Sequence, residues 1–246
     1  MKLYVGFCIA LISSVYAWAD KATYVNQAPV IDGNADEAFW QQGPWYKIDK
    51  HILGELPSEQ DFSGRYTLRW DKDFLYLLAE IQDDILFDAH PDPRERYWDD
   101  DCLEIFIDED YSGGEHLQND NAFAYHVGLD NQSVDIGPAH KDGSVNVRLL
   151  NEHIHSEWKR SAESPFIMTW ELAIRVFDDT YSDSSHNKSV TLQEGKKLGF
   201  MLAYCDNDGS AEREHFMGSH EIKPVNGDKN LGYKDASVFG ELTLVK

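Results

Sequence analysis

The chain has 246 residues, with 44 acidic against 22 basic side chains and a formal net charge of −22 at pH 7. This length fits one large domain or two small ones, and either is long enough to bury a core. So acidic a chain, without any run of Lys and Arg, repels nucleic acid and anionic membrane surfaces, and neither is expected as a partner. The 13% aromatic and 27% charged residues favour a folded protein over a disordered one.

Residues 1–19 have the layout of a secretory signal peptide. A positive Lys2 precedes a mostly apolar stretch, and Ala17-Trp18-Ala19 forms an A-x-A cleavage signal before the charged Asp20. The apolar stretch is shorter than the roughly 20 residues of a membrane span. We therefore expect residues 1–19 to be removed, leaving a secreted or periplasmic protein of residues 20–246 with no membrane segment.

One short helix is predicted at residues 36–41, where Asp36 and Glu37 would lie at the favourable N-terminal end of the helix dipole. Alternation and a high content of β-branched and aromatic residues predict eight strands further along the chain. These strands are expected at residues 66–70, 74–82, 102–108, 122–129, 145–150, 166–174, 197–205 and 238–244.

Turn-forming clusters separate the predicted strands, and strands do not alternate with helices. The pattern therefore predicts an all-β protein, an antiparallel β-sandwich of two sheets resembling a jelly roll, with long loops and one short N-terminal helix. No internal repeat or low-complexity linker divides it, which favours a single domain. The long connections at 82–97 and 177–194 are of the kind that carries function on a sandwich.

Two cysteines remain once Cys8 leaves with the signal peptide. Cys102 and Cys205 are an even number in an oxidising compartment, so a disulfide is one interpretation. Both lie in apolar strand-like runs, where a free cysteine behaves as a small buried hydrophobe, and this is the other. The sequence contains no C-x-x-C pattern, so a structural zinc site is not expected.

Acidic turns provide hard oxygen ligands of the kind that calcium prefers. Asp83 and Asp84 follow one predicted strand, and Asp206 and Asp208 follow another, in a DNDG turn. None of the acidic clusters matches the full EF-hand spacing. The sequence predicts these four carboxylates as ligands of a structural calcium ion.

Glu104 and Trp98 are the two single residues with the clearest claim to a binding site. Glu104 lies in the apolar run DCLEIFID, on the same strand face as Cys102 and Phe106. A carboxylate there needs hydrogen-bond donors, either sugar hydroxyls or a neighbouring Arg or Tyr. Trp98 follows the polar stretch HPDPRERY, and its flat face suits the C–H face of a sugar ring. The alternative is that Trp98 packs beneath its own loop.

Three motifs make the chain resemble carbohydrate-binding module family 9, including its stand-alone family 9-like members. They are IDGNADEAFW at 31–40, WDDDCLEIFIDED at 98–110, and LGFMLAYCDNDG at 198–209 together with VFGELTLV at 238–245. They follow the family's order and span nearly all of the expected mature chain. The resemblance implies a non-catalytic β-sandwich that binds oligo- or polysaccharides, often at chain ends, and holds structural calcium.

The resemblance also implies a sugar cleft beside the acidic strand, and Trp98 and Glu104 occupy the matching motif. The family's cleft has a second Trp, but this chain reads SAEREHFMGSHEI after the DNDG turn, so either Phe216 or His215 takes its place or the second clamp is missing. The candidate ligand-binding residues are Trp98, Glu104, Tyr125, His126 and Phe216.

Two other functions stay open at this point. Sandwiches of similar appearance bind haem through Met, His or Lys, and Met201, Met217 and several His residues are available here. Modules of the resembled family are often attached to glycoside hydrolases, so a glycoside-active enzyme that uses Glu104 is the second alternative.

Overall fold

The computed structural model describes residues 19–183 and 186–246, so the predicted signal peptide lies outside the described residues except for Ala19. The described residues form a 14-stranded sheet and two short 3-10 helices. No described helix is long and apolar enough to cross a membrane. The strands are β1 (Asp20–Tyr24), β2 (Tyr46–Ile48), β3 (Lys50–Gly54), β4 (Phe62–Trp70), β5 (Leu75–Asp83), β6 (Cys102–Asp108), β7 (Phe123–Gly128), β8 (Ser133–Gly137), β9 (Asn146–Leu149), β10 (Ile154–Arg160), β11 (Ile167–Ile174), β12 (Lys197–Asp206), β13 (His215–Gly218) and β14 (Gly240–Val245).

The strand order is β10-β11-β5-β4-β1-β14-β12-β6-β7-β8-β9, with β2 beside β4, and with β13 between β12 and β3. All neighbours pair antiparallel except β1, which pairs in parallel with both β14 and β4. The prediction of a purely antiparallel fold is therefore wrong at β1. β4 and β14 run in the same direction, so β1, which lies between them, is parallel to both. β1 thereby joins the two antiparallel halves into one mixed sheet.

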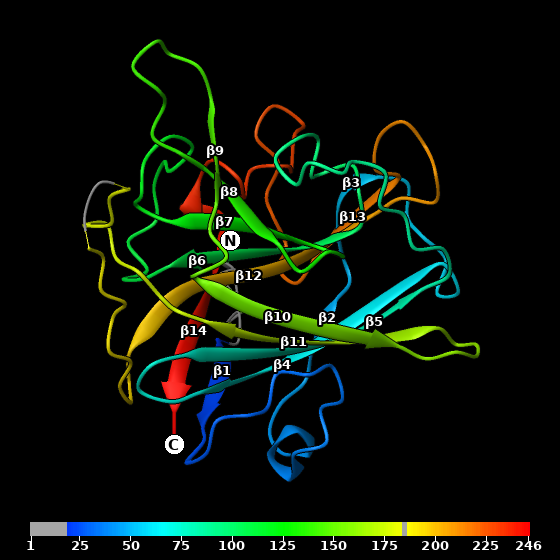
Figure 1. The fold of residues 1–246 in the computed structure, drawn as a ribbon, viewed down its shortest axis with the longest axis horizontal. Coiled ribbons are helices and arrows are strands. Elements are labelled where there is room, and N and C mark those ends of the chain that lie inside the picture. Colours follow the sequence, from blue (N-terminus) through cyan, green and yellow to red (C-terminus); the bar gives the residue numbers. More distant parts are fainter. Residues whose placement is uncertain (1–18, 184–185) are drawn as a thin grey trace, which may run out of the picture.

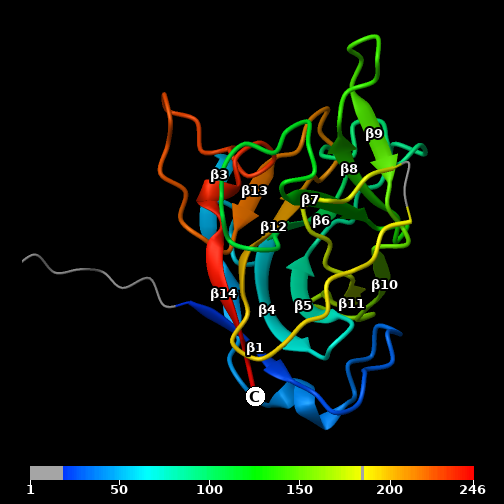
Figure 2. The same cartoon turned by 90° about the vertical axis from the view of Figure 1, so that its left-hand side faces the viewer.

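The sheet curls so that its two halves face each other across one apolar core (Figures 1 and 2). Leu77 of β5 and Leu172 of β11 come from one half, and Ile105 of β6 and Phe200 of β12 come from the other. All four are fully buried. The packing is that of the predicted sandwich, but its two layers are parts of a single curled sheet.

The outer face of β6 and β12 carries a second apolar cluster, which contains Cys102, Phe106, Met201 and Phe216. The segment 219–239, between β13 and β14, contributes Ile222 and other apolar residues to this cluster. Alternation along β6 places Glu104 on this outer face with Cys102 and Phe106, as the sequence predicted. Glu104 therefore points away from the main core, toward the loops at this end of the molecule.

Each of the eight predicted strands coincides with an observed strand, while β1, β2, β3, β8, β10 and β13 were not predicted. The predicted helix at 36–41 is a single 3-10 turn, η1 (Ala38–Gln41), which buries Trp40. A second short turn, η2, covers Ala236–Val238. The extended backbone of Glu37 (ψ 130°) and of Gln42 (ψ 151°) bounds η1 on both sides and leaves only four residues between them, so no α-helix forms there.

Candidate functional site

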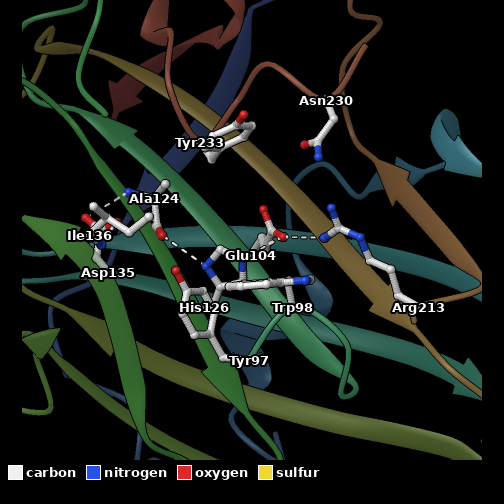
Figure 3. Close-up of a pocket in the computed structure, with 10 residues that line it drawn as sticks. All are labelled: Tyr97, Trp98, Glu104, Ala124, His126, Asp135, Ile136, Arg213, Asn230 and Tyr233. Atoms are coloured by element: carbon white, nitrogen blue, oxygen red, sulfur yellow. Dashed lines mark hydrogen bonds and ion pairs between the residues drawn. The ribbon is translucent and has the colours of Figure 1, made fainter. Parts of the chain in front are cut away.

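A cleft of about 300 Å³ opens on the outer face of β6, β7 and β8, at the low end of the size range for small-molecule sites. Three connections border it, namely loop 84–101, loop 207–214 and segment 219–239. Figure 3 shows the side chains around it. The lining residues are Tyr97, Trp98, Glu104, Ala124, His126, Asp135, Ile136, Arg213, Asn230 and Tyr233.

Glu104 forms the floor of this cleft. Its Oε1 atom lies 2.7 Å from Nε2 of His126 and 2.9 Å from Nη1 of Arg213. It also accepts a hydrogen bond from Sγ of Cys205, at 3.2 Å. Burial by itself would raise the pKa of Glu104, but the charge and hydrogen bond of His126, together with Arg213, outweigh it and lower the pKa to about 2. Glu104 is therefore an anion throughout the physiological range.

The second carboxylate oxygen of Glu104 points away from Arg213, into the cleft (Figure 3). All the side-chain hydrogen bonds of Glu104 to other described residues go to Oε1, so Oε2 has no partner among them. His126 also approaches the backbone oxygen of Ala124 with Nδ1, at 3.2 Å. Both ring nitrogens of His126 thus face oxygen acceptors. The floor is an ion-paired carboxylate with one oxygen available to a ligand.

Aromatic rings form two walls of the cleft. Trp98 is 41% exposed, so it does not pack beneath its own loop. Tyr97 supports it from the side with an edge contact, at 4.9 Å between ring centroids, and makes a similar contact with His126 at 4.6 Å. Tyr233 enters from segment 219–239, and in Figure 3 Tyr233 and Trp98 lie on either side of Glu104. Trp98 and Tyr233 thus bring two aromatic side chains to the lining of one cleft.

Two predicted ligand-binding residues lie elsewhere. Tyr125 belongs to the inner core, where its hydroxyl group is 2.9 Å from Nδ1 of His153, because alternation along β7 turns it away from its neighbour His126. Phe216 is buried in the outer cluster. The guanidinium group of Arg213 lies 4.1 Å from the centre of the Phe216 ring, so Phe216 supports Arg213 and does not face the cleft. The structure thus brings Trp98, Glu104 and His126 together, and it leaves out Tyr125 and Phe216.

Sequence reasoning missed five polar or aromatic lining residues: Tyr97, Asp135, Arg213, Asn230 and Tyr233. Only Tyr97 had a local signal, because it precedes Trp98. Asn230 and Tyr233 come from a segment more than 100 residues away along the chain. Gly232 allows this segment to lie directly on the sheet, because a Cβ atom there would come within 2.8 Å of Met201 and Phe106. This close approach places Tyr233 over the cleft.

Cys102 and Cys205, the two cysteines among the described residues, are buried free thiols. Cys102 on β6 lies directly opposite Cys205 on β12 in the strand register. Burial, first of all, raises the pKa of the Cys102 thiol. The structure therefore matches the interpretation of two small buried side chains, and Cys205 additionally donates to the floor of the cleft.

Six aspartates gather near the ends of loops 84–101 and 207–214, and we call them the aspartate cluster. Carboxylate oxygens of Asp83, Asp101 and Asp206 lie within 4.8 Å of one another, and those of Asp61, Asp84 and Asp208 form a second such group. His215, an alternative to Phe216 in the sequence prediction, instead lies beside Asp61 and Asp206. All four predicted calcium ligands belong to the cluster, and Asp61 and Asp101 join them from other parts of the chain.

Several oxygens of the aspartate cluster are buried without a hydrogen-bond partner in the described residues. They include both carboxylate oxygens of Asp206 and one each of Asp83, Asp208 and Asp61. Burial, reinforced by the charge of Asp83, raises the pKa of Asp101 to about 9 and that of Asp206 to about 8. Buried carboxylates of this kind are costly unless a proton or a cation neutralises them.

The donor set fits one kind of cation. Carboxylate oxygens dominate it, with one imidazole at its edge, and calcium prefers hard oxygen ligands, whereas structural zinc takes mainly Cys and His. Asp83, Asp101 and Asp206 would hold the ion at the buried end, where it would supply the positive charge that these carboxylates lack.

A family model described as carbohydrate family 9 binding domain-like matches residues 31–246 of this chain. Endo-1,4-beta-xylanase A of Thermotoga neapolitana is 26% identical over 268 residues, which cover 99% of this chain and 22% of that protein. Endo-1,4-beta-xylanase C of Paenibacillus barcinonensis is 26% identical over 221 residues, covering 89% of this chain and 16% of that protein. The chain therefore spans only a small part of the length of these curated relatives.

Two solved structures of a family 9 carbohydrate binding module from Caldicellulosiruptor kristjanssonii share the fold, each with a TM-score of 0.64 and 20% identity. One is a complex with cellotriose, and the match covers 92% of this chain and 93% of that one. The other is a complex with glucose, and the match covers 92% and 95%. At this identity the likeness concerns the fold alone.

Proposed function

Because this chain belongs to the carbohydrate family 9 binding domain-like family, we propose that it is a non-catalytic carbohydrate-binding protein whose cleft holds a sugar ring between Trp98 and Tyr233. One observation carries the proposal. Two aromatic side chains line the same cleft on either side of a charged, ion-paired carboxylate that keeps one oxygen available (Figure 3). Apolar walls above a polar floor match the two kinds of surface that a sugar ring presents.

The aromatic walls would supply the affinity. A pyranose ring has a face of C–H groups, and covering this face with a flat ring removes apolar surface from water. Trp98 is partly exposed already and is braced by Tyr97, so little rearrangement precedes binding. Tyr233 would cover the opposite face of the sugar.

The floor would supply the selectivity. Oε2 of Glu104 accepts hydrogen bonds, the guanidinium group of Arg213 donates them, and the amide of Asn230 does both. Neighbouring hydroxyl groups of a sugar present donors and acceptors at matching spacing. A ligand that lacks one of these hydroxyls leaves a desolvated polar atom without a hydrogen-bond partner, which is costly.

The pKa of Glu104 and the positions of two methionines bear on the two alternative functions. A carboxyl group with a pKa of about 2 does not donate a proton at neutral pH, so Glu104 is unsuited to general acid catalysis. Met201 and Met217, which favoured haem, lie buried in two different apolar clusters. Neither methionine lines the cleft.

We propose further that the aspartate cluster holds a structural calcium ion, and that the protein acts outside the cytoplasm in polysaccharide recognition or catabolism. The unpartnered oxygens of Asp206 support the first statement. The second is supported by the expected signal peptide and by relatives that are endo-xylanases. Cello- and xylo-oligosaccharides are the ligands to test first, since the relatives are a module solved with cellotriose and enzymes named for xylan.

Isothermal titration calorimetry of residues 20–246 with both oligosaccharide series, in calcium-containing buffer, tests the proposal. We expect binding of at least one series, with no release of reducing sugar during prolonged incubation. Absence of binding across a wide glycan panel would contradict sugar recognition. Turnover that disappears in Glu104→Gln would contradict the non-catalytic role.

A further inference from the structure

We propose that Asp101, Asp99 and Asn207 couple the aspartate cluster to the cleft, so that a divalent cation of the calcium class and a sugar each strengthen the binding of the other. This inference rests on the proposed function and adds a regulation to the same site. It follows from the two loops that the cluster and the cleft share. Loop 84–101 carries Trp98 and ends at Asp101, while loop 207–214 follows Asp206 and carries Arg213.

The first link runs from the aspartate cluster into both loops. The carboxylate of Asp101 belongs to the buried end of the cluster, beside Asp83 and Asp206. Its Oδ2 accepts the backbone N–H of Phe87 at 2.6 Å, within loop 84–101. Its Oδ1 accepts the backbone N–H of Asn207 at 2.9 Å, in loop 207–214. One cluster carboxylate therefore fastens the two loops to each other.

The second link runs from there to the cleft. The side chain of Asn207 donates to the backbone oxygen of Asp99 at 2.6 Å and accepts from the backbone N–H groups of Gly209 and Ser210. Oδ1 of Asp99 accepts the backbone N–H of Arg213 at 3.1 Å. Asn207 and Asp99 thus fix the backbone of the residue whose guanidinium group pairs with Glu104.

Trp98 is reached by the same connections, because it directly precedes Asp99. Oδ2 of Asp99 pairs with the guanidinium group of Arg96 at 2.8 Å, and Arg96 also donates to the backbone oxygen of Ala211 in loop 207–214. The side chains of Asp99 and Asn207 are nearly or fully buried, so water competes little for these bonds. Trp98 and Arg213, which both line the cleft, are therefore held by a series of hydrogen bonds that begins at the aspartate cluster.

Charge explains why a cation would act on these bonds. The carboxylate oxygens of Asp83, Asp101 and Asp206 lie within 4.8 Å of one another, so the three groups would repel if all were ionised, and in a buried site water screens this repulsion poorly. A bound cation removes the repulsion and favours the arrangement in which Asp101 holds both loops. Because that arrangement also presents Trp98 and Arg213, a sugar favours it too. By linkage, the factor by which one ligand helps the other is the same in both directions.

Calorimetry measures this factor. The dissociation constant for cellotriose is determined with excess calcium chloride and after removal of calcium by a chelator, and that for calcium with and without saturating cellotriose. We expect both constants to improve by the same factor, at least about fivefold. Equal constants with and without the second ligand would overturn the coupling while leaving sugar binding itself intact. Absence of cellotriose and all other glycan binding would instead contradict the proposed function.

Hydrogen exchange gives a readout that needs no sugar. Removal of calcium should speed exchange of the Asn207 and Arg213 amides, which donate to Asp101 and Asp99. The amide of Leu172 in β11, inside the main core, serves as the reference and should change little. Unchanged protection at Asn207 and Arg213 would contradict the coupling, and so would an equal loss at Leu172, because the effect would then be global.

Two variants separate coupling from binding. Asn207→Ala removes a connecting side chain that is neither a cluster carboxylate nor a lining residue of the cleft. We expect its coupling factor to fall toward one. Asp99→Asn is the milder variant of the same connection, since the amide keeps one acceptor oxygen, and it gives the same test if Asn207→Ala does not fold. Asp130→Asn, in an exposed turn outside both sites, is the matched control and should keep the full factor. Retention of the full factor in both connecting variants would overturn the proposal.

Discussion

Replacement of Trp98 by Ala tests the cleft most directly. A whole Trp side chain offers about 250 Å² of surface, and 41% of Trp98 is exposed, so a sugar that covered it would remove about 100 Å² from water. At about 25 cal/mol per Å² this burial is worth about 2.5 kcal/mol. The loss corresponds to an increase of the dissociation constant by about 60-fold. Because the side chain is already partly exposed, the free energy of unfolding should change much less than the binding free energy.

Calorimetric titration of wild-type and Trp98→Ala protein with the best oligosaccharide gives both dissociation constants, and urea unfolding gives the stability. Tyr111 is also 41% exposed, on the turn after β6, and Tyr111→Ala is the matched control. We expect weak or no binding by Trp98→Ala and unchanged binding by Tyr111→Ala. A change of less than about twofold for Trp98→Ala would refute the assignment of Trp98 as a wall of the cleft.

Three further predictions concern the floor, the second wall and the aspartate cluster. Glu104→Gln leaves Arg213 buried without its counter-charge, so urea unfolding should report a loss of about 3–5 kcal/mol; an unchanged midpoint would show that the ion pair adds no stability. Tyr233→Phe should keep sugar affinity within about twofold, because the ring remains, whereas Tyr233→Ala should cost about 1 kcal/mol; equal calorimetric affinities for the two variants would exclude a stacking role. Without calcium, unfolding free energy should fall as pH rises from about 4 to 8, by up to about 1.4 kcal/mol per pH unit for each carboxyl. The raised pKa values of Asp101 and Asp206 mean that the folded chain binds more protons than the unfolded chain in this range; a flat or rising profile would contradict this reasoning, and calcium should restore the stability at pH 8.

The sequence was informative where local alternation decides the structure. The run at 102–108 is buried along its whole length, and its period of two correctly places Glu104 on the face opposite Ile105. Strands such as β10, which reads IHSEWKR, were missed because their exposed face is strongly polar and their pairing with β11 supplies the stability. The parallel pairing of β1 had no local signal, since it depends on where two distant strands meet.

The site was predictable only where its residues lie close together in the sequence. Trp98 and Glu104 lie in one continuous motif, so one segment carries both. Arg213 and Tyr233 come from two later connections, and only the folded chain shows that these connections meet above β6. Phe216 was a reasonable aromatic candidate, but it became buried beneath Arg213, where its ring stabilises the charge and does not contact a ligand. Composition thus indicated the kinds of side chain present, and loop packing decided which of them face the cleft.

The charges around the cleft bear on the kind of sugar that it accepts. Arg213 and His126 both face Glu104. Asp135 adds a second acidic group to the lining, where the backbone N–H groups of Ala124 and Ile136 hold its carboxylate. The chain as a whole carries a charge of −22 and repels anionic ligands at long range. A neutral sugar is not opposed by this field, because in the proposed mode it would bind by covering Trp98 and by exchanging hydroxyl hydrogen bonds with the floor. The electrostatics of the chain and the aromatic walls of the cleft therefore favour the same class of ligand, an uncharged one.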